Sequence, residues 1–561
     1  MADEEKSRIG LCGLAVMGQV RHAVERRALP SPPPRRSVGR DDRSCSSRQI
    51  HLPAVGRRRA FPTRANSSFP TRFFFFIYTF SRRAHAPSRL VSSVPCRQNL
   101  ALNVAEKGFK ISVYNRSPDK TDNAVARAEK EGLGANFSGY KDMKEFVHSI
   151  QKPRCVIILV KAGAPVDATI AGLAEHMEPG DVIIDGGNEW YENTERRQKE
   201  AAEKGLLYLG MGVSGGEEGA RNGPAMMPGG DRAAFDVIEE VVTKVCAQTD
   251  SGPCVTYVGP GGAGNYVKMV HNGIEYGDMQ LIGEAFLLLK NTQNGKGLSR
   301  STKDCARIFD KYNRGKLKSF LVEITAGLLK KRDDRSDAML VDQVLDSCGS
   351  KGTGKWTVQE FADKGVACGT VAAALEARYL SALVAQRRRF ASIATVGVHE
   401  DLCPRIPEAV LEDALLCAKI CSYAQGMSLI RTTSLQKGWS AEPDSVLRCW
   451  QGGCIIRADL LKDFRKAYAD DPSLENLLMH PSIVAILTKD RIHAWRAVVG
   501  VAVQRGLPVP ALSASLAYYD SLRRPYLENA SLIQAQRDCF GGHTYRRRDD
   551  PDGTHTTQWL A

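Results

Sequence analysis

The sequence has no run of 18 or more apolar residues, so a membrane-spanning helix is not expected. Its fifteen cysteines, an odd number, include no CxxC pair, which argues against a disulfide framework or a zinc site. The acidic start, Met1-Ala2-Asp3-Glu4-Glu5, differs from a signal or transit peptide. We therefore expect a globular protein of a reducing compartment, cytoplasmic rather than plastid, with no membrane partner.

One segment, Val20–Gln98, contains no lysine at all. It holds 17 Arg and nine Pro but only three acids, and so accounts for the whole net charge of +14. With no hydrophobic period it cannot build a packed core, and we expect it to be mostly disordered. Because the rest of the chain is neutral overall, we expect no nucleic-acid partner.

The same segment has the marks of an intron read in frame. Its removal joins Gln19 to Asn99, so that a glycine turn opens directly into a helix. Val codons begin with GT, the Gln codon CAG ends in AG, and a run of Phe codons near the end is pyrimidine-rich. We interpret Val20–Gln98 as a retained intron or a gene-model error. The alternatives are a true disordered insertion and a basic segment that binds nucleic acid or membrane.

Short apolar runs alternate with helical patterns in the first part of the chain. Strands are expected at Arg8–Gly13, Phe109–Tyr114, Cys155–Val160, Val182–Ile184 and Leu206–Leu209, with a helix over Leu100–Gly108. This alternation predicts an α/β Rossmann-type, doubly wound parallel sheet.

Helical patterns dominate from residue 262 onward, for example at Asn265–Lys290 and Lys316–Lys331. We therefore expect an α/β domain over residues 1–261, interrupted at 20–98, and a large all-α domain over 262–522. Residues 523–561 form a polar C-terminal tail with no clear core.

A glycine turn of the form GxAxxG follows the first expected strand. It consists of Gly13, Leu14, Ala15, Val16, Met17 and Gly18. Such a turn lets the backbone approach a pyrophosphate at a helix N-terminus. The second strand ends in Asn115-Arg116-Ser117 where an NAD enzyme usually has an acid, and this donor set suits the 2′-phosphate of NADP. Val160-Lys161-Ala162 ends a later strand and could line the nicotinamide side.

Three further segments carry polar groups suited to chemistry. Asp185-Gly186-Gly187-Asn188 and Gly212-Val213-Ser214-Gly215-Gly216 end two strands and offer amide donors to a substrate carboxylate or hydroxyl. In a helix from Asn265, the residues Lys268, His271, Asn272 and Glu275 share one face, with Tyr276 on the same side. A solvated face would need no His–Asn pair, so we interpret this face as part of an active site.

The motifs together resemble the 6-phosphogluconate dehydrogenase family. They read GLAVMGQ…NLALNVAEKGF, DGGN, GVSGGEEGARNGPAMMPGG, GPGGAGNYVKMVHNGIEYGDMQLIGEA, KGTGKWT and QRDCFGGHTY. The resemblance covers nearly everything outside Val20–Gln98. It implies oxidation of 6-phosphogluconate by NADP with release of carbon dioxide, giving ribulose 5-phosphate in the pentose phosphate pathway. It also implies a homodimer whose tails reach into the partner subunit, and no metal.

The resemblance also implies residue roles. Lys268 would be the general base at the C3 hydroxyl, with its pKa lowered by burial or nearby positive charge, and Glu275 would protonate C1 after decarboxylation. The sugar-acid end would be held by Asn188, Ser214, Gly215, Gly216, His271 and Asn272, with Asn188 also near the cofactor. The 6-phosphate would be held by Tyr276, Lys351 and Arg378, together with Arg537 and His543 from the partner's tail.

Two other functions stay open at this stage. A related β-hydroxyacid dehydrogenase would share the glycine turn and the catalytic lysine but would not need Lys351, Arg378 and Arg537 around a phosphate. A binding-only protein is the second alternative, because the inserted segment interrupts the first helical turn, where backbone N–H groups should face the pyrophosphate. The catalytic residues are all present, which speaks against simple decay.

Overall fold

A computed structural model of the chain describes residues 9–12, 95–294, 297–394, 405–439 and 441–560. All of these described residues belong to one compact unit. The expected glycine turn at residues 13–18 and nearly all of Val20–Gln98 lie outside the described residues.

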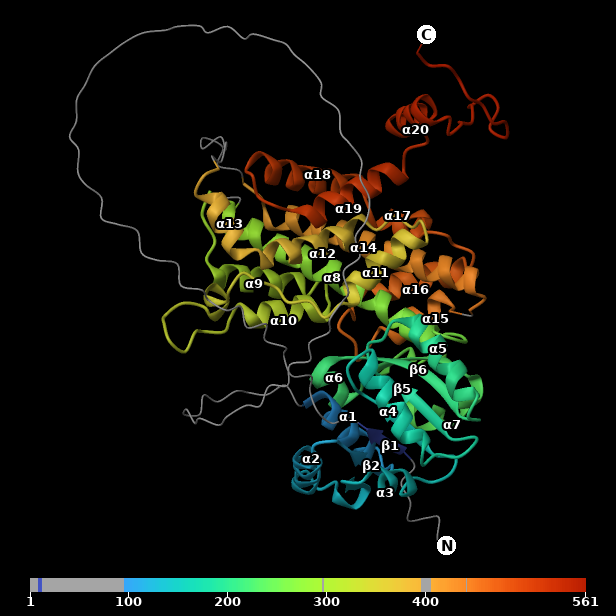
Figure 1. Ribbon diagram of the computed structural model, residues 1–561. Coiled ribbons are helices and arrows are strands. Elements are labelled where there is room, and N and C mark those ends of the chain that lie inside the picture. The colour runs from blue at the N-terminus through green and yellow to red at the C-terminus, as the bar shows by residue number, and fades with distance from the viewer. Residues whose placement is uncertain (1–8, 13–94, 295–296, 395–404, 440, 561) are drawn as a thin grey trace, which may run out of the picture. The chain divides into compact units, whose positions relative to one another are not determined.

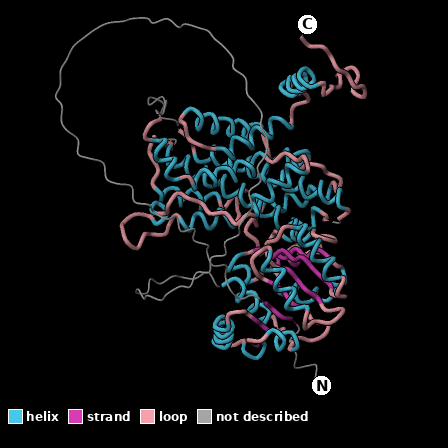
Figure 2. Tube along the Cα trace, viewed as in Figure 1, coloured by secondary structure: helices cyan, strands magenta, loops and turns pink. Residues whose placement is uncertain are grey.

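Seven strands form one sheet in the order β3-β2-β1-β4-β5-β6-β7 (Figure 2). They are β1 (Ile9–Cys12), β2 (Ile111–Tyr114), β3 (Phe137–Tyr140), β4 (Cys155–Ile158), β5 (Val182–Asp185), β6 (Leu207–Ser214) and β7 (Ala225–Gly230). All neighbouring pairs are parallel except β6 with β7. The expected doubly wound α/β sheet is therefore confirmed, with one antiparallel edge strand as a correction. The connection between β6 and β7 holds only the seven-residue helix α6 (Gly216–Asn222), too short for the crossover that a parallel strand needs.

Helices cover both faces of the sheet because successive strand residues point to opposite sides. In β1, Ile9 and Leu11 join an apolar cluster with α1, α2 and α7, whereas Cys12 joins another cluster with α3, α4 and α5. The bounds are α1 (Pro95–Glu106), α2 (Pro118–Lys130), α3 (Met143–His148), α4 (Ala164–Ala174), α5 (Tyr191–Ala202), α6 (Gly216–Asn222) and α7 (Arg232–Val245).

The chain then becomes helical, as expected (Figure 1). Two long helices, α8 and α14, are buried along much of their length and share one apolar core. The bounds are α8 (Ala263–Asn291), α9 (Thr302–Tyr312), α10 (Phe320–Leu328), α11 (Thr353–Asp363), α12 (Gly369–Ala382), α13 (Val384–Ala391), α14 (Glu408–Lys437), α15 (Pro443–Cys449), α16 (Leu460–Asp470), α17 (Pro481–Ile486), α18 (Lys489–Gln504) and α19 (Pro510–Leu522). A small hairpin of β8 (Gln248–Thr249) and β9 (Gly252–Pro253) precedes them.

The C-terminal tail is more ordered than its polar sequence predicts. It contains α20 (Glu528–Gly541), and the segment after that helix folds back around the buried carboxylate of Asp538. This carboxylate accepts hydrogen bonds from the backbone N–H groups of Thr544 and Thr557 and from the indole of Trp559. Among the described tail residues no apolar side chain is buried, as expected, and hydrogen bonds to this aspartate hold the segment against α20.

Two helix boundaries also differ from expectation. Helix α1 begins at Pro95, so the last residues of Val20–Gln98 are helical, and Gln98 is buried. Proline is well tolerated in a first helical turn, which explains the earlier start. The helix expected over Lys316–Lys331 is confined to α10, because a turn closed by Lys318 N–H and the Gly315 carbonyl precedes it.

Candidate active site

The N-terminal half of α8 carries the expected polar face. The amine of Lys268 donates to Asn272 Oδ1 at 2.6 Å and lies 3.5 Å from His271 Nδ1. His271 Nδ1 is 3.1 Å from the same Asn272 oxygen, and His271 Nε2 is 3.2 Å from Ser214 Oγ on β6. Since Asn272 Oδ1 can only accept, we assign the imidazole proton to Nδ1. Nε2 then accepts from the Ser214 hydroxyl, so four predicted residues form one hydrogen-bonded group.

Glycines let α8 approach the end of the sheet closely. A Cβ on Gly212 would stand 2.2 Å from Lys268 Cβ, and one on Gly264 would stand 2.1 Å from the Gly210 carbonyl oxygen. At the end of β6, Gly215 and Gly216 have φ angles of +129° and +62°, which L side chains rarely adopt. The glycines thus place the polar face of α8 directly against the strand end that bears Ser214.

Burial sets the protonation states in this group. It lowers the pKa of Lys268 below its ordinary value, although the charge of Glu275 opposes that shift. Burial and the neighbouring Lys268 hold the pKa of His271 well below its ordinary value, so the imidazole is neutral. Burial likewise raises the pKa of Glu275, against the charges of Lys268, Arg378 and Lys351. One end of the face therefore favours a neutral amine and the other a protonated carboxyl.

One turn further along α8, Tyr276 contacts Arg378, and the charges of Arg378 and Lys351 both act on Glu275. The Tyr276 hydroxyl is 3.0 Å from Ser350 Oγ, next to Lys351, and the Arg378 guanidinium of α12 lies 3.5 Å from the centre of the Tyr276 ring. A Cβ on Gly354 of α11 would stand 2.5 Å from that ring. Arg378 is therefore stacked on Tyr276 beside the polar face of α8, which separates it from an ordinary surface arginine.

The carboxyl ends of β2, β4 and β5 form the edge predicted to bind the cofactor. Asn115 is buried, Arg116 is exposed, and Ser117 caps α2 without a side-chain hydrogen bond to that helix. A guanidinium and a hydroxyl here fit a 2′-phosphate. Val160, Lys161 and Ala162 follow β4, and the exposed Asn188 follows β5. Parallel sheets bind nucleotides at this edge.

The two predicted tail residues lie in a different environment. Arg537 of α20 donates to Gln534 at 2.9 Å, and the His543 ring packs 5.8 Å from that of Phe540. Both belong to the segment organised around Asp538. Their expected role concerns a partner subunit's site and stays a prediction.

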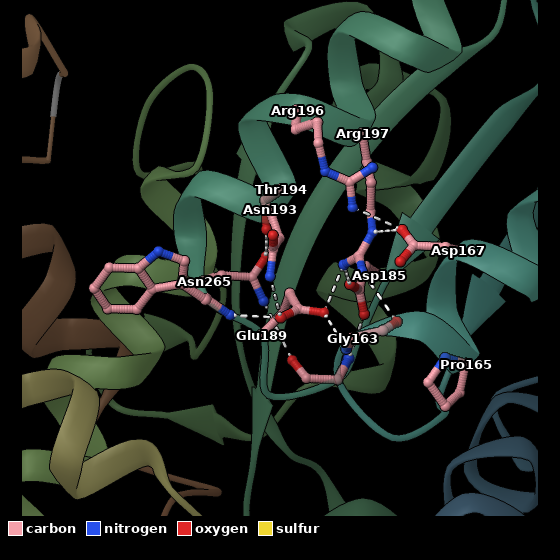
Figure 3. A network of polar contacts seen from close by, with 12 residues as sticks. Gly163, Pro165, Asp167, Asp185, Glu189, Asn193, Thr194, Arg196, Arg197 and Asn265 are labelled. Carbon is pink, nitrogen blue, oxygen red and sulfur yellow. Dashed lines mark hydrogen bonds and ion pairs between the residues drawn. The ribbon is translucent and has the colours of Figure 1, made fainter. Parts of the chain in front are cut away.

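A buried ionic network beside the site was not predicted from the sequence. The Arg197 guanidinium of α5 contacts Glu189, Asp167 and Asp185. The sequence shows a carboxylate at the end of β5, Asp185, and another four residues later, Glu189, but neither indicates an arginine partner. Figure 3 shows the side chains of Asp167, Asp185 and Glu189 around that of Arg197.

Within residues 9–12, 95–294, 297–394, 405–439 and 441–560, no three potential ligands gather to hold a metal ion. The expectation of a metal-free reaction stays a prediction. In the same ranges no helix is long and apolar enough to cross a membrane.

Comparisons with known proteins give consistent matches. The family profile "6-phosphogluconate dehydrogenase, C-terminal domain" matches residues 264–559, and "NAD binding domain of 6-phosphogluconate dehydrogenase" matches residues 98–259. The chain is 55% identical to "6-phosphogluconate dehydrogenase, decarboxylating 1" of Spinacia oleracea, over 82% of this chain and 95% of that protein. It is 54% identical to the chloroplastic "decarboxylating 3" enzyme of Arabidopsis thaliana, with the same coverage.

A solved structure agrees with these sequences. The Plasmodium falciparum 6-phosphogluconate dehydrogenase, described in its apo form and in complex with NADP+ and with 6-phosphogluconate, superposes with a TM-score of 0.78 at 45% identity. The match covers 82% of this chain and 97% of that one.

Proposed function

This chain belongs to the 6-phosphogluconate dehydrogenase family, and we propose that it converts 6-phosphogluconate to ribulose 5-phosphate and carbon dioxide with reduction of NADP. This is the decarboxylating reaction of the pentose phosphate pathway. The observation that carries the proposal is the face of α8, where a buried lysine with a lowered pKa and a partly buried glutamate with a raised pKa lie near each other.

Lys268 acts as the base in this proposal. A lysine can accept the C3 hydroxyl proton only in its neutral form, and burial increases the neutral fraction. Asn272 Oδ1 accepts a hydrogen bond from the amine and orients it. His271, which is neutral, adds no competing charge and aligns the Ser214 hydroxyl for the sugar-acid end.

Glu275 acts as the acid. It lies two turns after Lys268 on α8, and its raised pKa keeps a proton available for C1 once the carboxylate has left. Asn188, Gly215 and Gly216 would hold the sugar acid.

Tyr276, Lys351 and Arg378 bind the 6-phosphate in this scheme. Arg378 lies over the Tyr276 ring, and Lys351 follows Ser350, which contacts the Tyr276 hydroxyl; these groups form a suitable donor set for a dianion. This phosphate end separates the proposed function from that of a related β-hydroxyacid dehydrogenase, which would need no such cluster.

NADP fits the donor set at the carboxyl ends of the strands, and when bound it supplies the acceptor for the C3 hydride. Asn115, Arg116 and Ser117 would select the 2′-phosphate, and Val160-Lys161-Ala162 would face the nicotinamide. Gly13, Leu14, Ala15, Val16, Met17 and Gly18 would approach the pyrophosphate.

We also propose that the chain consists of an α/β domain at residues 1–261, an all-α domain at 262–522 and a tail at 523–561. We further propose that it forms a homodimer in which the two chains exchange tails. Support for the dimer comes from apolar side chains on the surface of α20, where Leu532, Ile533 and Phe540 are 61%, 54% and 74% exposed. Apolar surface of this kind commonly marks an interface. In the dimer, Arg537 and His543 would reach the partner's phosphate site. Light scattering of the full chain and of a chain ending at residue 522 tests this: the truncated chain should lose both the dimer and most of its activity.

The segment Val20–Gln98 is proposed to be absent from the mature enzyme. The nucleotide-binding profile starts at residue 98, next to the proposed junction. Deleting the segment should restore or raise activity, and equal activity of both forms would show that it loops out harmlessly. Transcript sequencing across Gln19–Asn99 tests the origin of the segment, and a predominant message that encodes it would refute the intron interpretation.

The decisive assay measures NADPH formation by the full chain and by the deleted form, with 6-phosphogluconate and with 3-hydroxyisobutyrate. We expect turnover of the first substrate only. Turnover of 3-hydroxyisobutyrate alone would favour the β-hydroxyacid alternative, and no turnover by either form would favour a binding-only protein.

The cytoplasmic location stays a prediction, because the matching relatives include chloroplastic forms.

A further inference from the structure

Arg197 joins two loops that leave the same edge of the sheet. The β4 loop, residues 159–163, contains the residues proposed to face the nicotinamide, and the β5 loop, residues 186–190, contains Asn188. Arg197 itself projects from α5, and its side chain is 1% exposed. Its position between the loops is visible in Figure 3.

Gly163, the last residue of the β4 loop, is held from both sides. Its backbone N–H donates to Glu189 Oε2 at 2.9 Å, and its carbonyl accepts from Arg197 Nη2 at 3.1 Å. Arg197 Nη1 donates to the same Glu189 oxygen at 2.5 Å, which closes a ring of three hydrogen bonds. The φ angle of Gly163 is +86°, so a substitution there would itself strain the loop.

Glu189 in turn fixes the β5 loop. Its second oxygen accepts from the backbone N–H of Trp190 at 2.8 Å and from Asn193 Nδ2 at 3.2 Å. Burial would raise the pKa of Glu189, but hydrogen bonds from Arg197 and from backbone N–H groups outweigh it and hold the pKa below its ordinary value. Glu189 therefore stays ionised and keeps both loops bound to Arg197.

The other side of Asn188 is tied to the catalytic helix. Asn265 Nδ2 of α8 donates to the Gly187 carbonyl at 3.2 Å, and Asn265 Oδ1 accepts from Thr194 of α5 at 3.0 Å. Asn265 precedes Lys268 by one helical turn. In the β5 loop, Asn188 therefore lies between Gly187, which is hydrogen-bonded to Asn265 of α8, and Glu189, which is hydrogen-bonded to Arg197.

We propose that Glu189 and Arg197 are positioning residues that set the spacing between the nicotinamide-facing loop and the sugar-acid-binding loop. We call Gly163, Glu189 and Arg197 the loop latch. The proposal rests on the proposed function, because the latch matters for hydride transfer only if these two loops hold the two reactants. Hydride transfer depends steeply on such spacing, and a displacement of about 1 Å can cost roughly a hundredfold in rate.

Two substitutions test the latch, with a matched control in the next residue. Arg197→Lys keeps the charge, but one ammonium cannot reach Asp167, Glu189 and the Gly163 carbonyl together. Glu189→Gln keeps the size but removes the charge that Arg197 contacts. The control is Arg196→Lys, because Arg196 also contacts Asp167 but its side chain is 44% exposed.

The first measurement is hydrogen exchange in the full-length protein without ligands. We expect amides in residues 159–166 and 186–190 to exchange about tenfold faster in both latch variants and unchanged in Arg196→Lys. In Glu189→Gln, amide exchange must become faster in the β4 loop as well as in the β5 loop, which contains residue 189. Unchanged exchange around Gly163 in both variants would overturn the latch, whether or not the chain turns over.

The second measurement separates positioning from simple stability. With 6-phosphogluconate deuterated at C3, the latch variants should show a kcat reduced about 10- to 100-fold and an isotope effect larger than that of the wild type. Faster exchange with unchanged kcat and isotope effect would refute a positioning role. An inactive wild-type chain would instead contradict the proposed function, and exchange would still decide whether the latch exists.

Discussion

The contact between Gly212 and Lys268 allows a quantitative prediction. In Gly212→Ala the added Cβ would stand 2.2 Å from Lys268 Cβ and 2.6 Å from its Cγ. An ordinary contact is at least 3.4 Å, so the lysine and β6 must separate by about 1.2 Å. A displacement of that size costs roughly a hundredfold in rate, or about 2.7 kcal/mol of transition-state stabilisation. We therefore expect kcat/KM to fall by about two orders of magnitude.

The control for this prediction lies on the same helix. Gly283 of α8 is exposed, and a Cβ there would meet nothing within 4 Å, so Gly283→Ala should keep full activity and gain up to about 1 kcal/mol of stability. Steady-state kinetics should be accompanied by thermal unfolding and by NADP binding, which show whether Gly212→Ala is folded. A folded Gly212→Ala enzyme with kcat/KM within twofold of the wild type would refute the reasoning.

Three further predictions follow from the site and from α8. In Glu275→Gln, Lys268 is the one member of the proposed acid–base pair that still titrates. The residual activity should therefore rise with pH as Lys268 loses its proton, and it should level off without the high-pH decline that loss of the Glu275 proton causes in the wild type. A decline that survives in the variant would contradict the acid role of Glu275. Arg378→Ala should raise KM for 6-phosphogluconate about tenfold or more, whereas the 90%-exposed Arg335→Ala should not, and equal effects would refute a specific phosphate contact. In Glu284→Gln the side chain loses one of the two oxygens that cap α19 at 2.8 Å, and chemical denaturation should show a loss of about 1–2 kcal/mol. A loss below about 0.3 kcal/mol would show that the cap is dispensable.

The sequence predicted the elements whose residues follow a clear period. The face of Lys268, His271, Asn272 and Glu275 was predictable because helical spacing brings these positions together whatever the surroundings. Burial of that face against a strand end needed the tertiary structure, and so did the resulting pKa shifts.

Other features escaped prediction for physical reasons. Strand β7 contains Pro228, Gly229 and Gly230, which are unfavourable in strands, and only its pairing with β6 makes it one. The loop latch joins residues far apart in sequence, so no local pattern indicates it. In the tail, order depends on one buried carboxylate, which hydropathy does not detect.

Helix α8 carries the proposed base at Lys268 and, sixteen residues later, the carboxylate of Glu284 that caps α19. Adding or removing one residue between them would turn Glu284 by about 100° around the helix axis and shift it by about 1.5 Å. The cap and the catalytic face could not then both keep their partners. Natural variation in this stretch should consist of substitutions alone, with length changes confined to the loops.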